Sequence, residues 1–138
     1  MKKYLFILIA ATLLVACGSK DSNEEQEKTK IRIDEKVEVN GAEINLQSIR
    51  IKEDDVRLYA DWVNKTPHES HLSYLAPIEI YQNGIIEIDT EKQERKVKSG
   101  VVGGLDTKFK LNNTEDSIEI KIFDKSKDEY EVITIDIP

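Results

Sequence analysis

The chain has 138 residues, of which 34% are charged and 39% hydrophobic, and its formal charge is −7 at pH 7. This length corresponds to one small domain with short accessory segments. The acidic balance argues against nucleic-acid binding, and against adhesion to anionic lipid through the charge of the whole chain. It leaves room for a local lysine-rich patch, as at residues 92–98.

Residues 1–16 are predicted to be a cleaved signal peptide. Lys2 and Lys3 form a short basic start, and residues 5–15 are an apolar run of 11 residues, interrupted only by Thr12. A membrane-spanning helix needs about 20 residues, so the run is too short to span and is typical of a secretory signal. Its removal takes away both lysines and moves the formal charge from −7 to −9.

The signal segment ends in Leu14-Val15-Ala16-Cys17, and Cys17 is the only cysteine of the chain. The tetrapeptide resembles the lipobox of bacterial lipoproteins, in which the cysteine thiol receives a diacylglyceryl group and the preceding peptide bond is cleaved. The resemblance implies lipid attachment at Cys17 and anchoring at the extracytoplasmic face of the cell membrane. The alternative is an ordinary signal peptide followed by an incidental cysteine.

Residues 17–30 are predicted to be the lipidated cysteine and a disordered acidic tether. The segment from Gly18 to Lys30 has no apolar residue and seven charged ones, so it cannot bury a core. A flexible chain of this length has a mean reach of roughly 20 Å. We therefore expect a spacer between the membrane and a folded domain at residues 31–138.

The composition of residues 31–138 predicts an all-β domain. This stretch has 16 Ile and 8 Val against 6 Leu and 3 Ala, and β-branched residues favour strands. Runs of alternating apolar and polar residues predict seven or eight short strands, each with one apolar face. They include residues 44–51, 56–62, 101–111, 118–122 and 132–137. The economical arrangement is an antiparallel sandwich of two sheets. Residues 89–96 have no apolar stripe, and we expect a solvated loop.

Two hairpins can be predicted with their register. A two-residue Asn40-Gly41 turn pairs Val39 with Ala42 and puts the apolar residues on one face. In the second hairpin a three-residue loop, 82–84, pairs Ile80 with Ile86 and Ile78 with Ile88. A two-residue turn would place Ile80 opposite Glu87, so the hydrophobic pattern selects the longer loop. We expect Gly84 to adopt the left-handed conformation there.

Several motifs together indicate a family. The Trp62-Val63-Asn64 strand end, the Tyr81–Gly84 hairpin and the Lys98–Gly100 turn, with the lipobox and the acidic tether, resemble small Gram-positive surface lipoproteins with an immunoglobulin-like domain of unknown function. The resemblance implies an immunoglobulin-like sandwich and a membrane location. It carries over no catalytic residue and no cofactor.

The strongest candidate for metal chemistry is His68-Glu69-Ser70-His71, which holds both histidines. Imidazole and carboxylate can ligate zinc or copper. The spacing differs from the i, i+4 of HExxH, so two solvated loop histidines are the simpler interpretation. Residues 124–128 are predicted to form a polar turn between two strands. Gly100, Gly103 and Gly104 are interpreted as turn glycines. Tyr59, Tyr74 and Tyr81 are interpreted as half-buried aromatic residues of a sheet, or alternatively as part of an interface.

The sequence thus predicts a lipid-anchored binding module of the cell envelope that is not an enzyme. We expect a monomer that contacts the bilayer through acylated Cys17 and an envelope protein through the loops at residues 64–75 and 89–98. One alternative is an exclusion or immunity lipoprotein that protects against a phage, a toxin or a mobile element. Another is a metal-handling lipoprotein that uses His68 and His71.

Overall fold

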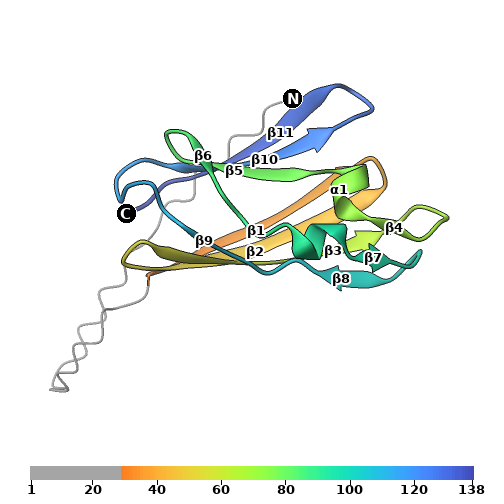
Figure 1. The fold of residues 1–138 in the computed structure, drawn as a ribbon, viewed down its shortest axis with the longest axis horizontal. Coiled ribbons are helices and arrows are strands. Elements are labelled where there is room, and N and C mark those ends of the chain that lie inside the picture. The colour runs from red at the N-terminus through yellow and green to blue at the C-terminus, as the bar shows by residue number, and fades with distance from the viewer. Residues whose placement is uncertain (1–28) are drawn as a thin grey trace, which may run out of the picture.

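The computed structural model describes residues 29–138. The predicted signal peptide, Cys17 and all but the last two residues of the predicted tether lie outside the described residues. The chain forms two antiparallel sheets that pack face to face, shown in Figure 1. This confirms the predicted β-sandwich. The first strand begins at Thr29, two residues before the expected start of the domain.

The first sheet has the order β1-β2-β3, with β8 and β9 both paired to β3. Its strands are β1 (Thr29–Val39), β2 (Ala42–Lys52), β3 (Asp55–Asn64), β8 (Val102–Gly104) and β9 (Thr107–Lys110). The second sheet has the order β11-β10-β5-β6. Its strands are β5 (Ile78–Tyr81), β6 (Ile85–Ile86), β10 (Ile118–Asp124) and β11 (Glu129–Ile135). A small third pair joins β4 (Ser70–His71) to β7 (Lys96–Val97).

The strand order is of the immunoglobulin type. The chain runs from the first sheet to the second, returns to the first with β8 and β9, and ends in the second. The paired strands β2, β3 and β9 take the places of immunoglobulin strands A, B and E, and β5, β10 and β11 those of C, F and G. With the interrupted β8 and β9 treated as one strand, each of the two main sheets has four strands, within the predicted seven or eight.

The register of both hairpins is as predicted where the strands pair. Val39 lies opposite Ala42, and the turn residues Asn40 and Gly41 both have positive φ. In the second hairpin Ile80 lies opposite Ile86 across the three-residue loop. Two details differ. Asn83 takes the left-handed conformation (φ 51°), whereas Gly84 has φ 124°. The strand β6 ends at Ile86, so the expected pairing of Ile78 with Ile88 does not form.

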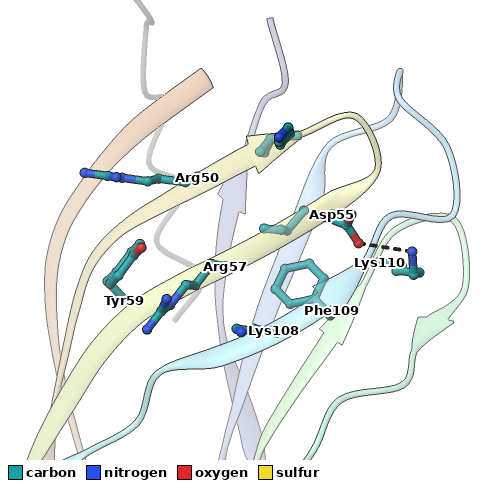
Figure 2. A pocket seen from close by; sticks show the side chains of 10 residues that line it. Arg50, Asp55, Arg57, Tyr59, Lys108, Phe109 and Lys110 are labelled. Atoms are coloured by element: carbon teal, nitrogen blue, oxygen red, sulfur yellow. Dashed lines mark ion pairs between the residues drawn. The ribbon is translucent and has the colours of Figure 1, made fainter. Parts of the chain in front are cut away.

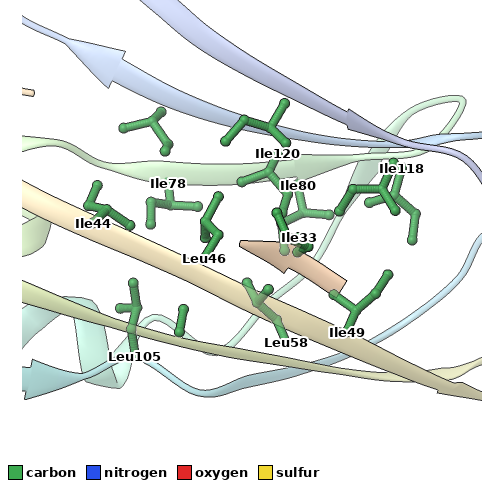
Figure 3. Packing of buried hydrophobic residues seen from close by; sticks show 14 of the residues in the cluster. Ile33, Ile44, Leu46, Ile49, Leu58, Ile78, Ile80, Leu105, Ile118 and Ile120 are labelled. Atoms are coloured by element: carbon green, nitrogen blue, oxygen red, sulfur yellow. The ribbon is translucent and has the colours of Figure 1, made fainter. Parts of the chain in front are cut away.

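The core lies between the two sheets and consists mainly of isoleucine. In Figure 3, Leu46 and Leu58 of the first sheet point toward Ile80 and Ile120 of the second. All four side chains are almost completely buried. Because these residues alternate with more exposed ones along β2, β3, β5 and β10, each of these strands presents an apolar side to the core and a more polar side to solvent.

Two predicted loops are partly ordered into helical turns. The expected solvated loop at 89–96 contains α2 (Glu91–Glu94), and residues 64–75 contain β4 and α1 (Leu72–Leu75). Gln93 on α2 is buried, and its amide exchanges hydrogen bonds with the backbone N–H and C=O of Ile78, at 3.1 and 3.3 Å. Gln93 is the one buried residue of 89–96, and its two hydrogen bonds hold the helical turn against β5, while the other residues of the segment are exposed or half-buried.

The predicted strand at 101–111 is two strands, because β8 ends at Gly104 and β9 begins at Thr107. In residues 29–138 no helix has the length and apolar character needed to cross a membrane.

Candidate functional site

Four basic side chains form a continuous line across the outer face of the first sheet. The pairing registers place Lys30 opposite Arg50, Arg50 opposite Arg57, and Arg57 opposite Lys108, on β1, β2, β3 and β9. All four residues are exposed. We call these four residues the basic row. Directly opposite residues in a sheet lie close together, and like charges in such pairs are destabilising.

The strand pattern fixes the direction in which the basic row points. On β2 the flanking residues Ile49 and Ile51 are buried, and on β3 the flanking residues Val56 and Leu58 are buried. Because successive side chains alternate between the two faces of a sheet, Arg50 and Arg57 must point to solvent. The hydrophobic core therefore forces the basic row onto one exposed surface.

A tyrosine lies between the two arginines. The guanidinium carbon of Arg57 lies 4.9 Å from the ring centre of Tyr59, and that of Arg50 lies 5.6 Å from it. Figure 2 shows these three side chains on neighbouring β2 and β3, with Lys108 beside them on β9. Guanidinium groups stack on aromatic faces and keep their donors free, so Tyr59 positions both arginines without neutralising them.

The basic row has little compensating negative charge. Its ion pair within the described chain joins Arg57 to Asp106, at 3.8 Å. Among residues 29–138, Lys30, Arg50 and Lys108 form no ion pair. The neighbouring Lys110 differs, because it pairs with Asp55 at 3.0 Å and its pKa is raised by that hydrogen bond. Three of the four cations of the row are thus without an ion pair among residues 29–138, in a protein that is acidic overall.

The other end of the same face shows the contrast. Glu43 accepts ion pairs from Lys36, at 3.3 Å, and from Lys65, at 2.5 Å. Hydrogen bonds from Lys65 and then Lys36 lower the pKa of Glu43. The positive charges of these two lysines are balanced by the carboxylate of Glu43, as is common on a solvent-exposed sheet. The basic row, with a single ion pair for four cations, is therefore a local exception.

Open hollows adjoin the basic row. One, of about 560 Å³, is lined by Arg50, Arg57, Tyr59 and Lys108 together with Lys52, the ion-paired Asp55 and Lys110, and three apolar residues of the same strands (Figure 2). A second, of about 240 Å³, shares Arg57 and Lys108 and adds Lys92 and Arg95 from the α2 region. Part of the lysine-rich segment singled out from the sequence thus extends the basic face, although acidic Asp89, Glu91 and Asp106 also line this second hollow.

The two histidines do not form a recognisable metal site. Nδ1 of His71 lies 2.8 Å from the hydroxyl of Ser73, and its ring contacts Tyr74 edge-on. His68 is exposed, and its backbone carbonyl accepts hydrogen bonds from Asn64 and Thr66. Within residues 29–138 no three His, Cys, Asp or Glu side chains are grouped as metal ligands. Metal binding at His68 and His71 stays a prediction.

The other singled-out residues have structural partners. Tyr81 donates a hydrogen bond to Glu79, and the ammonium group of Lys121 lies over its ring. Tyr74 is exposed, and the ammonium group of Lys125 lies over its ring. Gly103 packs directly against Trp62. Cys17, the predicted lipid attachment site, lies outside the described residues.

The basic row itself was missed from the sequence. Its members come from four strands, and they meet only when the pairing of β1, β2, β3 and β9 is known. The available signal was the alternation of basic and apolar residues in Lys30-Ile31-Arg32, Arg50-Ile51-Lys52 and Lys108-Phe109-Lys110. That pattern indicates a basic strand face without showing that the faces join.

Comparison with known proteins supports the fold alone. No family model and no curated protein matches the chain. A crystal structure of a conserved hypothetical protein from Bacillus anthracis is similar with a TM-score of 0.60 and 8% identity, over 78% of this chain and 98% of that one. An uncharacterised β-sandwich protein from Clostridium difficile gives a TM-score of 0.51 and 14% identity, over 74% and 90%.

Proposed function

We propose that this protein is a lipid-anchored, non-catalytic binding module of the cell envelope, and that it binds an anionic ligand on the basic row. The supporting observation is the alignment of Lys30, Arg50, Arg57 and Lys108 in neighbouring registers. Such an alignment opposes folding, and the protein has acidic residues in plenty with which to neutralise it. A binding role accounts for a positive surface that stability alone disfavours.

The chemistry of the row suits phosphate or carboxylate groups. Arginine offers five N–H donors in a planar fork that matches these anions, and its charge persists at all physiological pH values. The exposed lysines at the two ends, Lys30 and Lys108, add point charges. Because the hollow beside the row is open, the ligand would bind at the surface with part of it in solvent, and binding would weaken with salt.

The anchoring half of the proposal is tested by the mass and partitioning of the processed protein. Wild type and Cys17→Ser are produced in a bacterium and separated between detergent and water. The proposal expects wild type in the detergent phase with an intact mass raised by two or three acyl chains, and Cys17→Ser without this added mass, whether or not the apolar residues 5–15 that it keeps hold it in the same phase. Wild type in the aqueous phase, cleaved elsewhere, would overturn the lipid anchor.

The binding half is tested with inorganic polyphosphate as a soluble anionic probe. The double variant Arg50→Glu/Arg57→Glu is compared with Lys96→Glu/Lys98→Glu, which makes the same change in net charge at β7 and the following turn, toward the other end of the sandwich (Figure 1). We expect the Kd for polyphosphate to rise at least about tenfold in the first variant and to change little in the second. Equal effects of the two variants, or no binding by wild type, would contradict a specific site.

A further inference from the structure

Building on the proposed function, we infer that the anions bound by the basic row are lipid headgroup phosphates of the membrane that anchors the chain. The row would then hold the outer face of the first sheet against the bilayer. The lipid-anchored protein would be oriented by this contact as well as tethered. Three features favour a membrane over a soluble anion.

The first is where the described chain begins. Strand β1 starts at Thr29, one residue before Lys30 in the basic row. Cys17 precedes Thr29 by twelve residues, and even a fully extended chain of that length spans only about 40 Å. An acyl group on Cys17 would therefore confine Thr29, and Lys30 next to it, to within about 40 Å of the membrane surface, a distance at which the row can reach the headgroups.

The second is shape. The row crosses four neighbouring strands, and strand spacing of about 4.8 Å makes it about 14 Å wide. Small ligands are usually enclosed in pockets, whereas the hollow beside Arg50 and Arg57 is open to solvent. A broad exposed sheet face matches an extended surface that presents many phosphates side by side.

The third is the charge distribution. The chain is acidic overall, with a formal charge of −7, so an anionic bilayer repels the protein as a whole. The row is the exception, since each basic side chain near an anionic surface favours binding by about fivefold. The inference therefore departs from the expectation, drawn from the charge of the whole chain, that anionic lipid repels the protein. Because the basic row is attracted to an anionic bilayer and the rest of the protein is repelled, the orientation with the row facing the bilayer is favoured.

Vesicle sedimentation tests the inference. The full chain carrying Cys17→Ser is mixed with vesicles of phosphatidylcholine alone or with about 30% phosphatidylglycerol added. Association through the apolar residues 5–15 appears in both kinds of vesicle, and any contribution of Lys2 and Lys3 to phosphatidylglycerol binding is the same in every charge variant, so the variants are compared with one another. The quantity of interest is therefore the increase caused by phosphatidylglycerol, for which we expect at least about tenfold tighter binding.

The charge variants locate the contact. Arg50→Glu/Arg57→Glu should abolish the increase, and Lys96→Glu/Lys98→Glu should retain it. Arg50→Gln/Arg57→Gln should lose most of it, and it guards against an effect of the new carboxylates on folding. Raising the salt from about 0.1 M to about 1 M shortens the Debye length from about 10 Å to about 3 Å and should remove the increase in every variant.

The outcomes separate this inference from the proposed function. If polyphosphate binds through Arg50 and Arg57 but phosphatidylglycerol adds nothing, the membrane inference is wrong and the ligand is a soluble polyanion. If the increase survives in Arg50→Glu/Arg57→Glu, the lipid contact lies elsewhere and the inference is again overturned. If neither polyphosphate nor anionic vesicles bind, the anionic-ligand proposal fails together with it.

Discussion

Arg50 and Arg57 face each other across β2 and β3, and both guanidinium groups lie near the ring of Tyr59, at 5.6 and 4.9 Å from its centre. Contact with the ring stabilises each cation by about 0.5–1 kcal/mol at an exposed site. It does not remove the repulsion between the arginines, nor that from Lys30 and Lys108 on either side. The repulsion among the four cations lowers the stability of the fold, whereas the same positive charges attract an anion.

This relationship predicts that Arg50→Glu stabilises the fold. The new carboxylate would lie between Lys30 and Arg57, and a directly opposed pair of unlike charges contributes about 0.2–1 kcal/mol. Urea unfolding should therefore show a higher midpoint with an unchanged slope. The same variant should bind polyphosphate more weakly, so stability and binding should change in opposite directions.

Arg50→Gln is the control for this prediction, because it removes the charge without adding a carboxylate. It should fall between wild type and Arg50→Glu in unfolding midpoint, and the differences should shrink at high salt. If Arg50→Glu is less stable than Arg50→Gln, the basic row does not create the repulsion described above.

Gly103 should not tolerate a side chain. A Cβ added there would lie 2.6 Å from a methyl carbon of Val97 and 3.1 Å from Nε1 of Trp62, which is fully buried. Gly103→Ala should lower the free energy of unfolding by about 1–3 kcal/mol through overpacking. The adjacent Gly104→Ala is the matched control, since a Cβ there meets nothing within 4 Å. Similar losses in both variants would show that backbone freedom matters, and not the contact with Trp62.

Gln82 is predicted to stabilise the loop between β9 and β10. Its buried amide donates to the carbonyls of Asn113 and Asp116, both at 2.8 Å, and accepts from the N–H groups of Asn112 and Asn113. Gln82→Met keeps a similar volume and leaves these backbone groups without that partner. We expect a loss of about 3 kcal/mol in the free energy of unfolding.

Gln47→Met is the comparison for Gln82→Met, because Gln47 is exposed and makes a single hydrogen bond, to Asp61. It should change the free energy of unfolding by about 0.5 kcal/mol or less. Hydrogen exchange of the amides of Asn112 and Asn113 should speed up in Gln82→Met alone. Unchanged exchange there would mean that the loop is held by other contacts.

The predictable part of the fold is the part set by local pattern. Ile118, Ile120 and Ile122 alternate with polar residues, and alternation of this kind specifies a strand with one buried face. The Asn40-Gly41 pair specifies a tight turn, and therefore the register of its hairpin. These signals involve residues close in sequence, so no tertiary information is needed.

The unpredicted features depend on contacts between distant segments. Gln82 and Gln93 are polar residues in a loop and in a short helical turn, and they are buried because their amides bond to the backbone of segments distant in sequence. The basic row depends on the pairing of β3 with β9, which follows a long crossover through the second sheet. Alternation along a strand shows which residues share a face, but not which strands lie next to each other.

The β10–β11 turn provides a test of pH dependence. Asp124 is buried, and its carboxylate accepts hydrogen bonds from the hydroxyl and the backbone N–H of Ser126, at 2.5 and 3.0 Å. The hydroxyl hydrogen bond is the largest influence, and it lowers the pKa of Asp124 below its ordinary value of 3.8, against the opposing effect of burial. The ionised form is therefore bound more favourably in the folded state than in the unfolded chain.

A carboxyl group whose pKa is lowered by folding stabilises the protein above its unfolded pKa, and this contribution disappears as the pH falls through the folded pKa. The difference in unfolding free energy between wild type and Asp124→Asn should therefore be largest above about pH 5 and should narrow below pH 3.8.

Ser126→Ala should reduce this pH dependence, because it removes the hydroxyl donor. Asp128→Asn is the matched control at an exposed position of the same turn. Urea unfolding measured between about pH 2.5 and pH 7 decides the matter: a constant difference between wild type and Asp124→Asn would mean that ionised Asp124 gains nothing from its hydrogen bonds to Ser126.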